Sequence, residues 1–300
     1  MTARGLAALA VAGGVFLAGG SAAETLYTAT SRGYASPGEF IGRLYKVDSN
    51  DGSARLVGPI RIGGTTPVGV TGLAVDPKSG VLYGITAGLL PARPSLITID
   101  TKNGNATLVG RLGAAASDVN FDGKGTLYAW LTDTDQLAIV DLQTGQAAAM
   151  GTARQDGAVG GGFTVERDGK ALVSSTTAGG SLDTVDLVTG AVTHGPSLAG
   201  APYLSAITSL TISPGGRLMG VNSNLGVPAK ASLVSINART GAVSEVSALP
   251  DDADALAFSP EGVGLDDAPA TRWIVIVLAF AAVLALSVWA VWRHRGKTEG

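Results

Sequence analysis

Tight polar turns interrupt short apolar segments along this chain, and one kind of turn recurs five times. Each copy carries Asp or Asn at its first position and Gly at its fifth, and each follows a short apolar segment such as residues 96–99, Leu-Ile-Thr-Ile. Apolar runs of this length that are bounded by turn residues predict β-strands. The five turns occupy residues 48–52, 100–104, 141–145, 186–190 and 237–241.

A second repeated unit alternates with the first. Its clearest copy is residues 72–85, where an apolar strand, the turn Asp-Pro-Lys-Ser-Gly and the strand Val-Leu-Tyr-Gly-Ile follow one another, and further copies begin at Asp118, Gly162, Ser209 and Ala255. Two hairpins per repeat make four strands, and the five turns begin 41 to 52 residues apart, which is the period of a propeller blade. The pattern predicts an all-β fold, a five-bladed β-propeller of four-stranded antiparallel blades, over residues 24–262.

The last copy of the second unit is incomplete, because no Leu-Tyr strand follows residues 255–262. Residues 24–30, Glu-Thr-Leu-Tyr-Thr-Ala-Thr, carry the missing pattern at the other end of the chain. We expect this N-terminal segment to complete the fifth blade as its second strand. Such a closure pairs the two ends of the domain and removes an open sheet edge.

The recurring turn has a structural explanation. Asp or Asn at its first position accepts hydrogen bonds from backbone N–H groups ahead of it, and Gly adopts the left-handed conformation that ends the turn. A calcium loop is the alternative, since residues 48–52 partly resemble the opening of an EF-hand. No glutamate follows at the twelfth position, and the other copies lose carboxylates, so the structural interpretation is favoured.

The N-terminal segment 1–23 has the organisation of a secretory signal peptide. It contains one early positive charge at Arg4, an apolar stretch over residues 6–18, and small residues directly before Glu24. We expect cleavage there, with an uncleaved N-terminal anchor as the alternative. Either way, the propeller is expected outside the cytoplasm.

The C-terminal segment Trp273–Trp292 is apolar apart from Ser287 and is about 30 Å long as a helix, which matches the hydrocarbon thickness of a bilayer. Tryptophan at both ends and the basic tail 293–300 predict a single-pass transmembrane helix with a cytoplasmic C-terminus. Residues 263–272 form the linker. The layout partly resembles the sorting signals of bacterial surface proteins, but neither Leu-Pro-x-Thr-Gly nor Pro-Glu-Pro precedes the helix, which favours permanent anchoring in the cell membrane.

The amino-acid composition excludes several kinds of binding site and partner. The chain contains no cysteine, which excludes disulfides and thiolate metal sites. Of its 21 basic and 24 acidic residues, 17 and 23 remain after Arg4 and the charged residues of the tail are set aside, so the propeller is acidic. An acidic domain argues against nucleic acid as a partner.

The two repeats resemble the Leu-Tyr-x-Ile-Asp-x-x-Thr-Gly-x-x-x-x-Val-Gly and Leu-Ala-x-x-Pro-x-Gly-x-Leu-Tyr units of exported bacterial β-propellers, many of which have no assigned activity. The resemblance covers residues 24–262. It implies the fold and leaves the function open, because propellers of this kind serve as binding platforms and as hydrolases, lyases and quinoproteins.

Irregular segments gather on one face of the predicted propeller. If the strands of a blade are lettered A to D from the axis outwards, the A–B and C–D turns are tight, whereas the B–C and D–A connections are longer and less regular. Binding function is usually found on such loops, so the loop face is the predicted interaction surface. Its candidate contact residues are Arg32, Tyr34, Glu39, Phe40, Arg93, Arg154, Asp156 and Tyr203.

The sequence contains few groups of residues that could form a catalytic site. One of the two histidines, His294, lies in the tail and the other, His194, follows a predicted outer strand, so a histidine-based triad or metal site at the axis is not expected. The remaining candidate is a divalent cation such as Ca²⁺ bound near the axis, as the resemblance to sugar-lactonase propellers implies, by Asp118, Asn222 and Asp254.

Two functions follow from this sequence. The favoured one is a membrane-anchored extracytoplasmic binding or assembly module without a cofactor, whose partner is an envelope protein or a small ligand. The alternative is a metal-dependent hydrolase of the sugar-lactonase type. The chain leaves the last blade on the tight-turn face, so the anchor is expected to hold that face toward the membrane and the loop face away from it.

Overall fold

The computed structural model describes the propeller region of the chain. The described residues are 25–31, 42–87, 93–154, 160–166, 168–175, 180–203, 206–226 and 228–259. The predicted signal peptide, linker, transmembrane helix and basic tail lie outside the described residues. Within the described part of the chain, no helix is long and apolar enough to cross a membrane.

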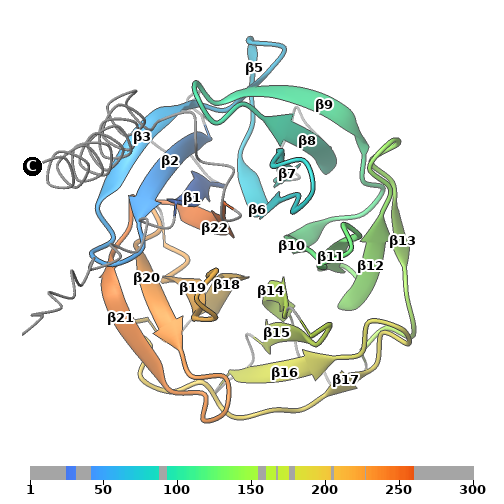
Figure 1. Ribbon diagram of the computed structural model, residues 1–300, viewed down its shortest axis with the longest axis vertical. Coiled ribbons are helices and arrows are strands. Elements are labelled where there is room, and N and C mark those ends of the chain that lie inside the picture. Colours follow the sequence, from blue (N-terminus) through green and yellow to red (C-terminus); the bar gives the residue numbers. More distant parts are fainter. Residues whose placement is uncertain are drawn as a thin grey trace, which may run out of the picture.

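Five antiparallel sheets are arranged as blades around a central axis, which confirms the predicted five-bladed propeller (Figure 1). The blades are numbered from the first complete one, and each is given from its innermost strand outwards. Blade 1 contains β6 (Val70–Val75), β7 (Leu82–Thr86), β8 (Ser95–Ile99) and β9 (Asn105–Arg111); blade 2, β10 (Ala116–Phe121), β11 (Leu127–Leu131), β12 (Gln136–Val140) and β13 (Ala147–Ala149); blade 3, β14 (Gly160–Val165), β15 (Ala171–Ser175), β16 (Ser181–Val185) and β17 (Val192–Thr193); blade 4, β18 (Ala206–Ile212), β19 (Leu218–Ser223), β20 (Ala231–Ile236) and β21 (Val243–Ala248); and blade 5, β22 (Ala253–Phe258), β1 (Thr25–Thr30), β2 (Arg43–Asp48) and β3 (Ala54–Pro59).

Blade 5 joins the two ends of the domain, as the sequence predicts. β1 pairs with β22 on one side, with Leu26 opposite Phe258, and with β2 on the other, with Leu26 opposite Val47. The Thr28 hydroxyl donates a 2.8 Å hydrogen bond to the Ala255 carbonyl oxygen. The N-terminal strand is therefore the second strand of the fifth blade, and the ring is closed by backbone pairing.

The connection from the last strand of blade 5 to the first strand of blade 1 contains an additional hairpin. Between blades 5 and 1, β4 (Arg61–Ile62) and β5 (Thr66–Pro67) pair with each other, and β4 also pairs in parallel with β9. Gly63 and Gly64 both have positive φ, and the Thr65 N–H donates to the Ile62 carbonyl oxygen. Two consecutive residues with positive φ define the type I′ turn that favours tight hairpins.

The hydrophobic core consists of five clusters, and each lies between two neighbouring blades. Between blades 2 and 3, the fully buried Trp130 stacks on Phe163, with 6.2 Å between ring centroids. Because each sheet is buried on both faces against its neighbours, no blade has a core of its own. The stability of the ring therefore depends on contacts between blades.

The recurring Gly of the C–D turn makes one of these contacts in every blade. All five of these glycines have φ near +70° to +80°, and each turn lies against the outer part of the preceding blade. A Cβ at Gly104 would lie 2.8 Å from the Pro59 carbonyl oxygen, and a Cβ at Gly145 would lie 2.8 Å from the Gly110 carbonyl carbon. Gly is required twice over at these positions, by its backbone conformation and by the lack of space for a side chain.

Two glycines of blade 4 allow the backbone requirement and the space requirement to be tested separately. Gly216 in the A–B turn has φ +82° and open space around it, so Gly216→Ala should cost only the backbone strain of about 1–2 kcal/mol. Gly241 in the C–D turn has φ +72°, and its Cβ would overlap the Ser197 carbonyl oxygen of blade 3. We expect Gly241→Ala to cost about 3–5 kcal/mol, which urea unfolding monitored by tryptophan fluorescence would measure. Equal losses for the two variants would contradict the interblade role of the turn.

Candidate binding site

The innermost strands place five equivalent residues around the axis in one layer. In each blade the pairing of the innermost strand shifts register at or next to this position, so the five residues correspond. A Cβ at Gly72 would lie 2.8 Å from the Asp118 Cα, and a Cβ at Gly162 would overlap the backbone of Ser209. The layer is thus packed so tightly that it holds only one large side chain. Its members are Gly72, Asp118, Gly162, Ser209 and Ala255.

Asp118 occupies the centre of this layer and is fully buried. One carboxylate oxygen accepts the Phe163 N–H of blade 3 (3.0 Å) and the Leu210 N–H of blade 4 (2.9 Å), and the other accepts the Val119 N–H (3.0 Å). Burial raises the pKa of Asp118, and these N–H donors together with the Ser209 side chain oppose that rise. The carboxylate therefore joins blades 2, 3 and 4 at the axis.

Hydroxyl groups extend this connection around the ring. Ser209 Oγ accepts the Leu256 N–H of blade 5 at 3.0 Å. At the preceding position of three inner strands, hydroxyls donate to the carbonyl oxygen of the next blade: Thr71 to Ala116, Ser117 to Gly161 and Thr208 to Asp254. These polar groups are committed to holding the inner strands together.

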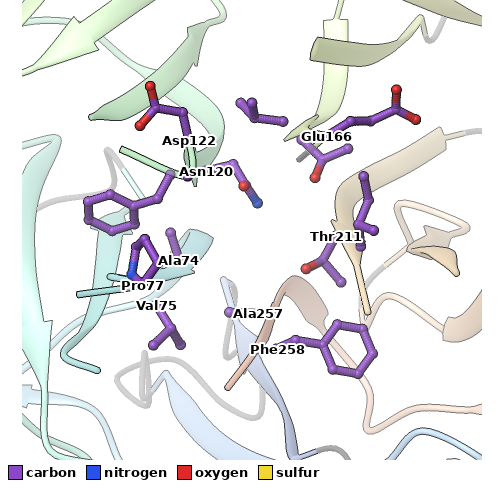
Figure 2. A pocket seen from close by; sticks show the side chains of 14 residues that line it. Ala74, Val75, Pro77, Asn120, Asp122, Glu166, Thr211, Ala257 and Phe258 are labelled. Atoms are coloured by element: carbon purple, nitrogen blue, oxygen red, sulfur yellow. The ribbon is translucent and has the colours of Figure 1, made fainter. Parts of the chain in front are cut away.

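A cavity of about 430 Å³ lies beyond the Asp118 layer, toward the A–B turns. Side chains two residues apart on a strand point to the same side, so the next five equivalent positions also face the axis. All five line the cavity (Figure 2). They are Ala74, Asn120, Thr164, Thr211 and Ala257, and the other lining residues are Val75, Pro77, Phe121, Asp122, Gly123, Val165, Glu166, Ile212 and Phe258. We call the mouth of this cavity the turn end of the axis, and the opposite end the loop end.

The five axis-facing positions of the cavity are polar in three blades and alanine in two, and the position after each of them is apolar in all five blades. Asn120, Thr164 and Thr211 come from the consecutive blades 2, 3 and 4, whereas Ala74 and Ala257 come from blades 1 and 5. In Figure 2 the Asn120 amide and the Thr211 hydroxyl point toward the centre of the cavity. The Thr164 hydroxyl is buried and has no hydrogen-bond partner.

Among the predicted loop-face residues, Arg154 is buried in an ion-pair cluster. Its side chain is only 8 % exposed, and it lies 3.3 Å from Asp135 of blade 2 and 3.1 Å from Asp183 of blade 3. Trp130 Nε1 donates to Asp135 at 2.6 Å, and His194 Nδ1 lies 3.2 Å from Asp183. These contacts give Arg154 a structural role between two blades.

Arg93 and Tyr203 remain candidates for partner contact. Arg93 is exposed, and its carbonyl oxygen accepts the Thr86 and Ser95 hydroxyls. Tyr203 is half-buried, and its backbone N–H and carbonyl oxygen both bond to the Asn222 amide, at 2.7 and 3.0 Å. The predicted contact residues Arg32, Tyr34, Glu39, Phe40 and Asp156 lie outside the described residues.

The three residues of the metal alternative have separate tasks. The Asp118 oxygens accept backbone N–H groups at the axis, whereas the Asn222 amide bonds to the backbone of Tyr203 and also donates to the Ala206 carbonyl oxygen at 2.8 Å. The carbonyl oxygen of Asp254 accepts the Thr208 hydroxyl. Within the described ranges, no group of three His, Cys, Asp or Glu residues is placed to hold a metal ion. The geometry of Asp118 and Asn222 does not fit a shared ligand set.

Comparison with known proteins supports the fold. No protein-family model matches this chain, and no curated protein matches it. Among solved structures, a chain from a nidogen/laminin complex is 12 % identical with a TM-score of 0.51, and the match covers 79 % of this chain and 98 % of that one. A protein of unknown function from Bacteroides caccae (12 % identity, TM-score 0.49, 79 % and 100 % covered) and TolB from Acinetobacter baumannii (11 %, 0.44, 79 % and 67 %) are also similar. At these identities the similarity concerns the propeller fold alone.

Sequence reasoning missed the cavity at the turn end. It aligned Asp118 with Gly72, Gly162 and Ser209, and the same alignment moved two residues along would have grouped Asn120, Thr164 and Thr211. Each of these side chains is an ordinary polar strand residue in its own blade. Only the closed ring brings the three together.

The axial carboxylate yields a stability prediction. Asp118→Asn keeps one oxygen for the Phe163 and Leu210 N–H groups but places its N–H₂ against the Val119 N–H in a fully buried layer, and we expect it to cost about 1–3 kcal/mol in urea unfolding. Asp186→Asn is the matched control, because the exposed Asp186 caps a C–D turn and Asn237 already fills the same role in blade 4. Wild-type stability of Asp118→Asn would show that the second carboxyl oxygen, which accepts the Val119 N–H, contributes nothing to the axial layer.

Proposed function

We propose that this chain is a membrane-anchored, extracytoplasmic propeller that binds a partner through its loop end. Export by residues 1–23 and anchoring by Trp273–Trp292 are parts of this proposal. β22 ends at the turn end of the axis, so an anchor that follows it would direct the turn end toward the membrane. The loop end would then face away from the membrane and be accessible to an envelope protein or a small ligand.

The observation that carries the binding proposal is the fixation of loop-end backbone by buried side chains. Asn222, which is 1 % exposed, makes three hydrogen bonds to the backbone of Tyr203 and Ala206. Thr86, also 1 % exposed, accepts the Ser95 N–H and donates to the Arg93 carbonyl oxygen. Loop-end backbone that is held in this way at Arg93, Ser95, Tyr203 and Ala206 loses little conformational freedom on binding, which favours recognition.

Binding is supported better than the hydrolase alternative. A lactonase-type site requires Asp118 and Asn222 to offer their oxygens to one common ligand. In this propeller the Asp118 carboxylate accepts backbone N–H groups inside the axis, and the Asn222 amide is bonded to a loop. Both side chains are therefore engaged in hydrogen bonds that stabilise the fold. Nothing in their contacts favours catalysis.

Known structures of the same fold are compatible with this proposal. One similar chain comes from a complex of nidogen with laminin. At 12 % identity that likeness assigns no partner here. The partner therefore has to be found by capture on the protein itself.

Alanine at Tyr203 or Arg93 tests the loop end. Full-length protein in detergent, used as bait for envelope extracts, should retain a partner that Tyr203→Ala and Arg93→Ala release, with affinity about tenfold weaker for each. The sequence makes the same prediction for Tyr34→Ala and Phe40→Ala. Val188→Ala is the control, because Val188 is 85 % exposed in a C–D turn away from the loop end. Equal retention by every variant would remove these residues from the binding surface.

A further inference from the structure

The B–C connection of blade 4 places an exposed apolar side chain at the loop end. This connection joins β19 to β20, and Leu225 within it is 48 % exposed. The other large apolar side chains that are exposed in the described part of the chain lie on strands or in the tight turns of the opposite end. They are Leu56, Val81, Leu108, Ile139 and Val188. Among the described residues, Leu225 is therefore the large apolar side chain that the loop end offers to a partner.

The backbone of Leu225 has a conformation that a bulky residue rarely adopts. Its φ is +54°, in the left-handed region, where the Cβ atom lies too close to the following carbonyl oxygen. The two other non-glycine residues with positive φ in the described ranges are Asp135 and Asp252, and Asp tolerates this region better than Leu. Asn or Gly would fit at position 225 with less strain. Strained backbone is concentrated at functional sites, so this conformation is a second observation besides exposure.

Hydrogen bonds fix the backbone on both sides of Leu225. Asn224 Oδ1 accepts the Gly226 and Lys230 N–H groups, both at 2.9 Å, and the Asn224 N–H donates to the Lys230 carbonyl oxygen at 3.0 Å. The Leu225 N–H donates to Ser223 Oγ at 3.1 Å. The backbone that carries Leu225 is thus ordered before a partner arrives, which lowers the entropic cost of binding.

Other loop-end groups lie beside this connection. Lys230 Nζ donates to both carboxylate oxygens of Asp251, at 2.7 and 3.0 Å. This hydrogen bond raises the pKa of Lys230, and the nearby Tyr203 and Asp252 add to the rise. Tyr203 is therefore close to Lys230. We call Leu225, Tyr203, Lys230 and Asp251 the blade-4 patch. Because Lys230 and Asp251 neutralise each other, the patch needs no charged group on its partner.

We infer that the partner of the loop end is a protein, and that an apolar pocket on this protein receives the Leu225 side chain. The inference rests on the loop-end binding proposed above and names the class of partner. Small ligands bind in concave sites, and the cavity described in this propeller lies at the opposite end of the axis. A protein surface can instead enclose an exposed side chain in a pocket of its own, and such anchors contribute much of the affinity of protein interfaces.

Leu225→Asn is the decisive variant, because Asn tolerates the left-handed region and lacks the apolar side chain. Full-length protein in detergent serves as bait for two envelope extracts, one untreated and one digested with proteinase K. We expect digestion to abolish capture, and Leu225→Asn to bind the partner about tenfold more weakly than the wild type does. Leu56→Asn is the matched control and should retain the partner, because Leu56 is 51 % exposed on the outer strand β3. In urea, Leu225→Asn should unfold at no lower concentration than the wild type.

The hydrogen bonds of Asn224 provide a second pair of variants. Asn224→Ala removes the acceptor of two N–H groups and leaves Leu225 in place, so we expect capture to weaken about threefold. Asn224→Asp keeps an acceptor oxygen at the same position and should bind as the wild type does. Equal capture by these two variants would contradict the role of ordered backbone in the inference.

The outcomes separate this inference from the loop-end proposal. Undiminished capture by Leu225→Asn together with loss of capture by Tyr203→Ala would overturn the inference and leave loop-end binding in place. Two further results would have the same effect: a partner that survives protease digestion, which is then a small ligand or a glycan, and marked destabilisation by Leu225→Asn, which gives Leu225 a packing role. If neither variant weakens capture, or if the wild type retains nothing, both proposals are wrong.

Discussion

Close backbone contact between neighbouring blades is the constraint on which the rest of this propeller depends. At the periphery, the Gly of each C–D turn lies so near the outer part of the preceding blade that a Cβ would overlap it. A sheet that is buried on both faces cannot be stable alone. The contacts of these turns with the preceding blades and the pairing of β22 with β1 therefore hold the ring together. The recurrence of Gly52, Gly104, Gly145, Gly190 and Gly241 reflects this requirement as much as it reflects the turn.

The same constraint is strictest at the axis, where five strands converge. Gly72 and Gly162 have no room for a side chain, and Ser209 and Ala255 have little, so one carboxylate fills the layer. Five equivalent aspartates would repel one another and exceed the space. A single Asp118 instead accepts N–H groups from two other blades, which gives its buried carboxyl oxygens the hydrogen bonds that they need. Its position explains why a residue of metal-ligand type is structural here.

The sequence predicts those structural features that depend on residues close together within one repeat, or on the spacing of the repeats. Strand order, blade number, the left-handed Gly of the turn and the closing role of residues 24–30 all follow from local pattern and period, and the described structure confirms them. Side-chain contacts between different repeats cannot be predicted from local pattern and period. Arg154 reaches Asp183 and Asp135 only because blades 2 and 3 pack together, and the polar side chains of the turn-end cavity lie some 45 residues apart in the chain. Sequence reasoning therefore identified the loops but missed the axial cavity.

The Asp118 layer and the layer of axis-facing residues next to it are both asymmetric. Asp118 accepts N–H groups from blades 3 and 4, and in the layer above it the polar residues lie on the same three blades, 2, 3 and 4. The neighbouring blades 5 and 1 carry alanine in that layer, and the ring closes within blade 5. A propeller built from equal repeats would offer a ligand five equivalent walls. Here a single buried carboxyl group fills the layer below the turn-end cavity, and the five axis-facing positions of that cavity are unequal, with polar side chains from blades 2, 3 and 4 and alanine from blades 1 and 5.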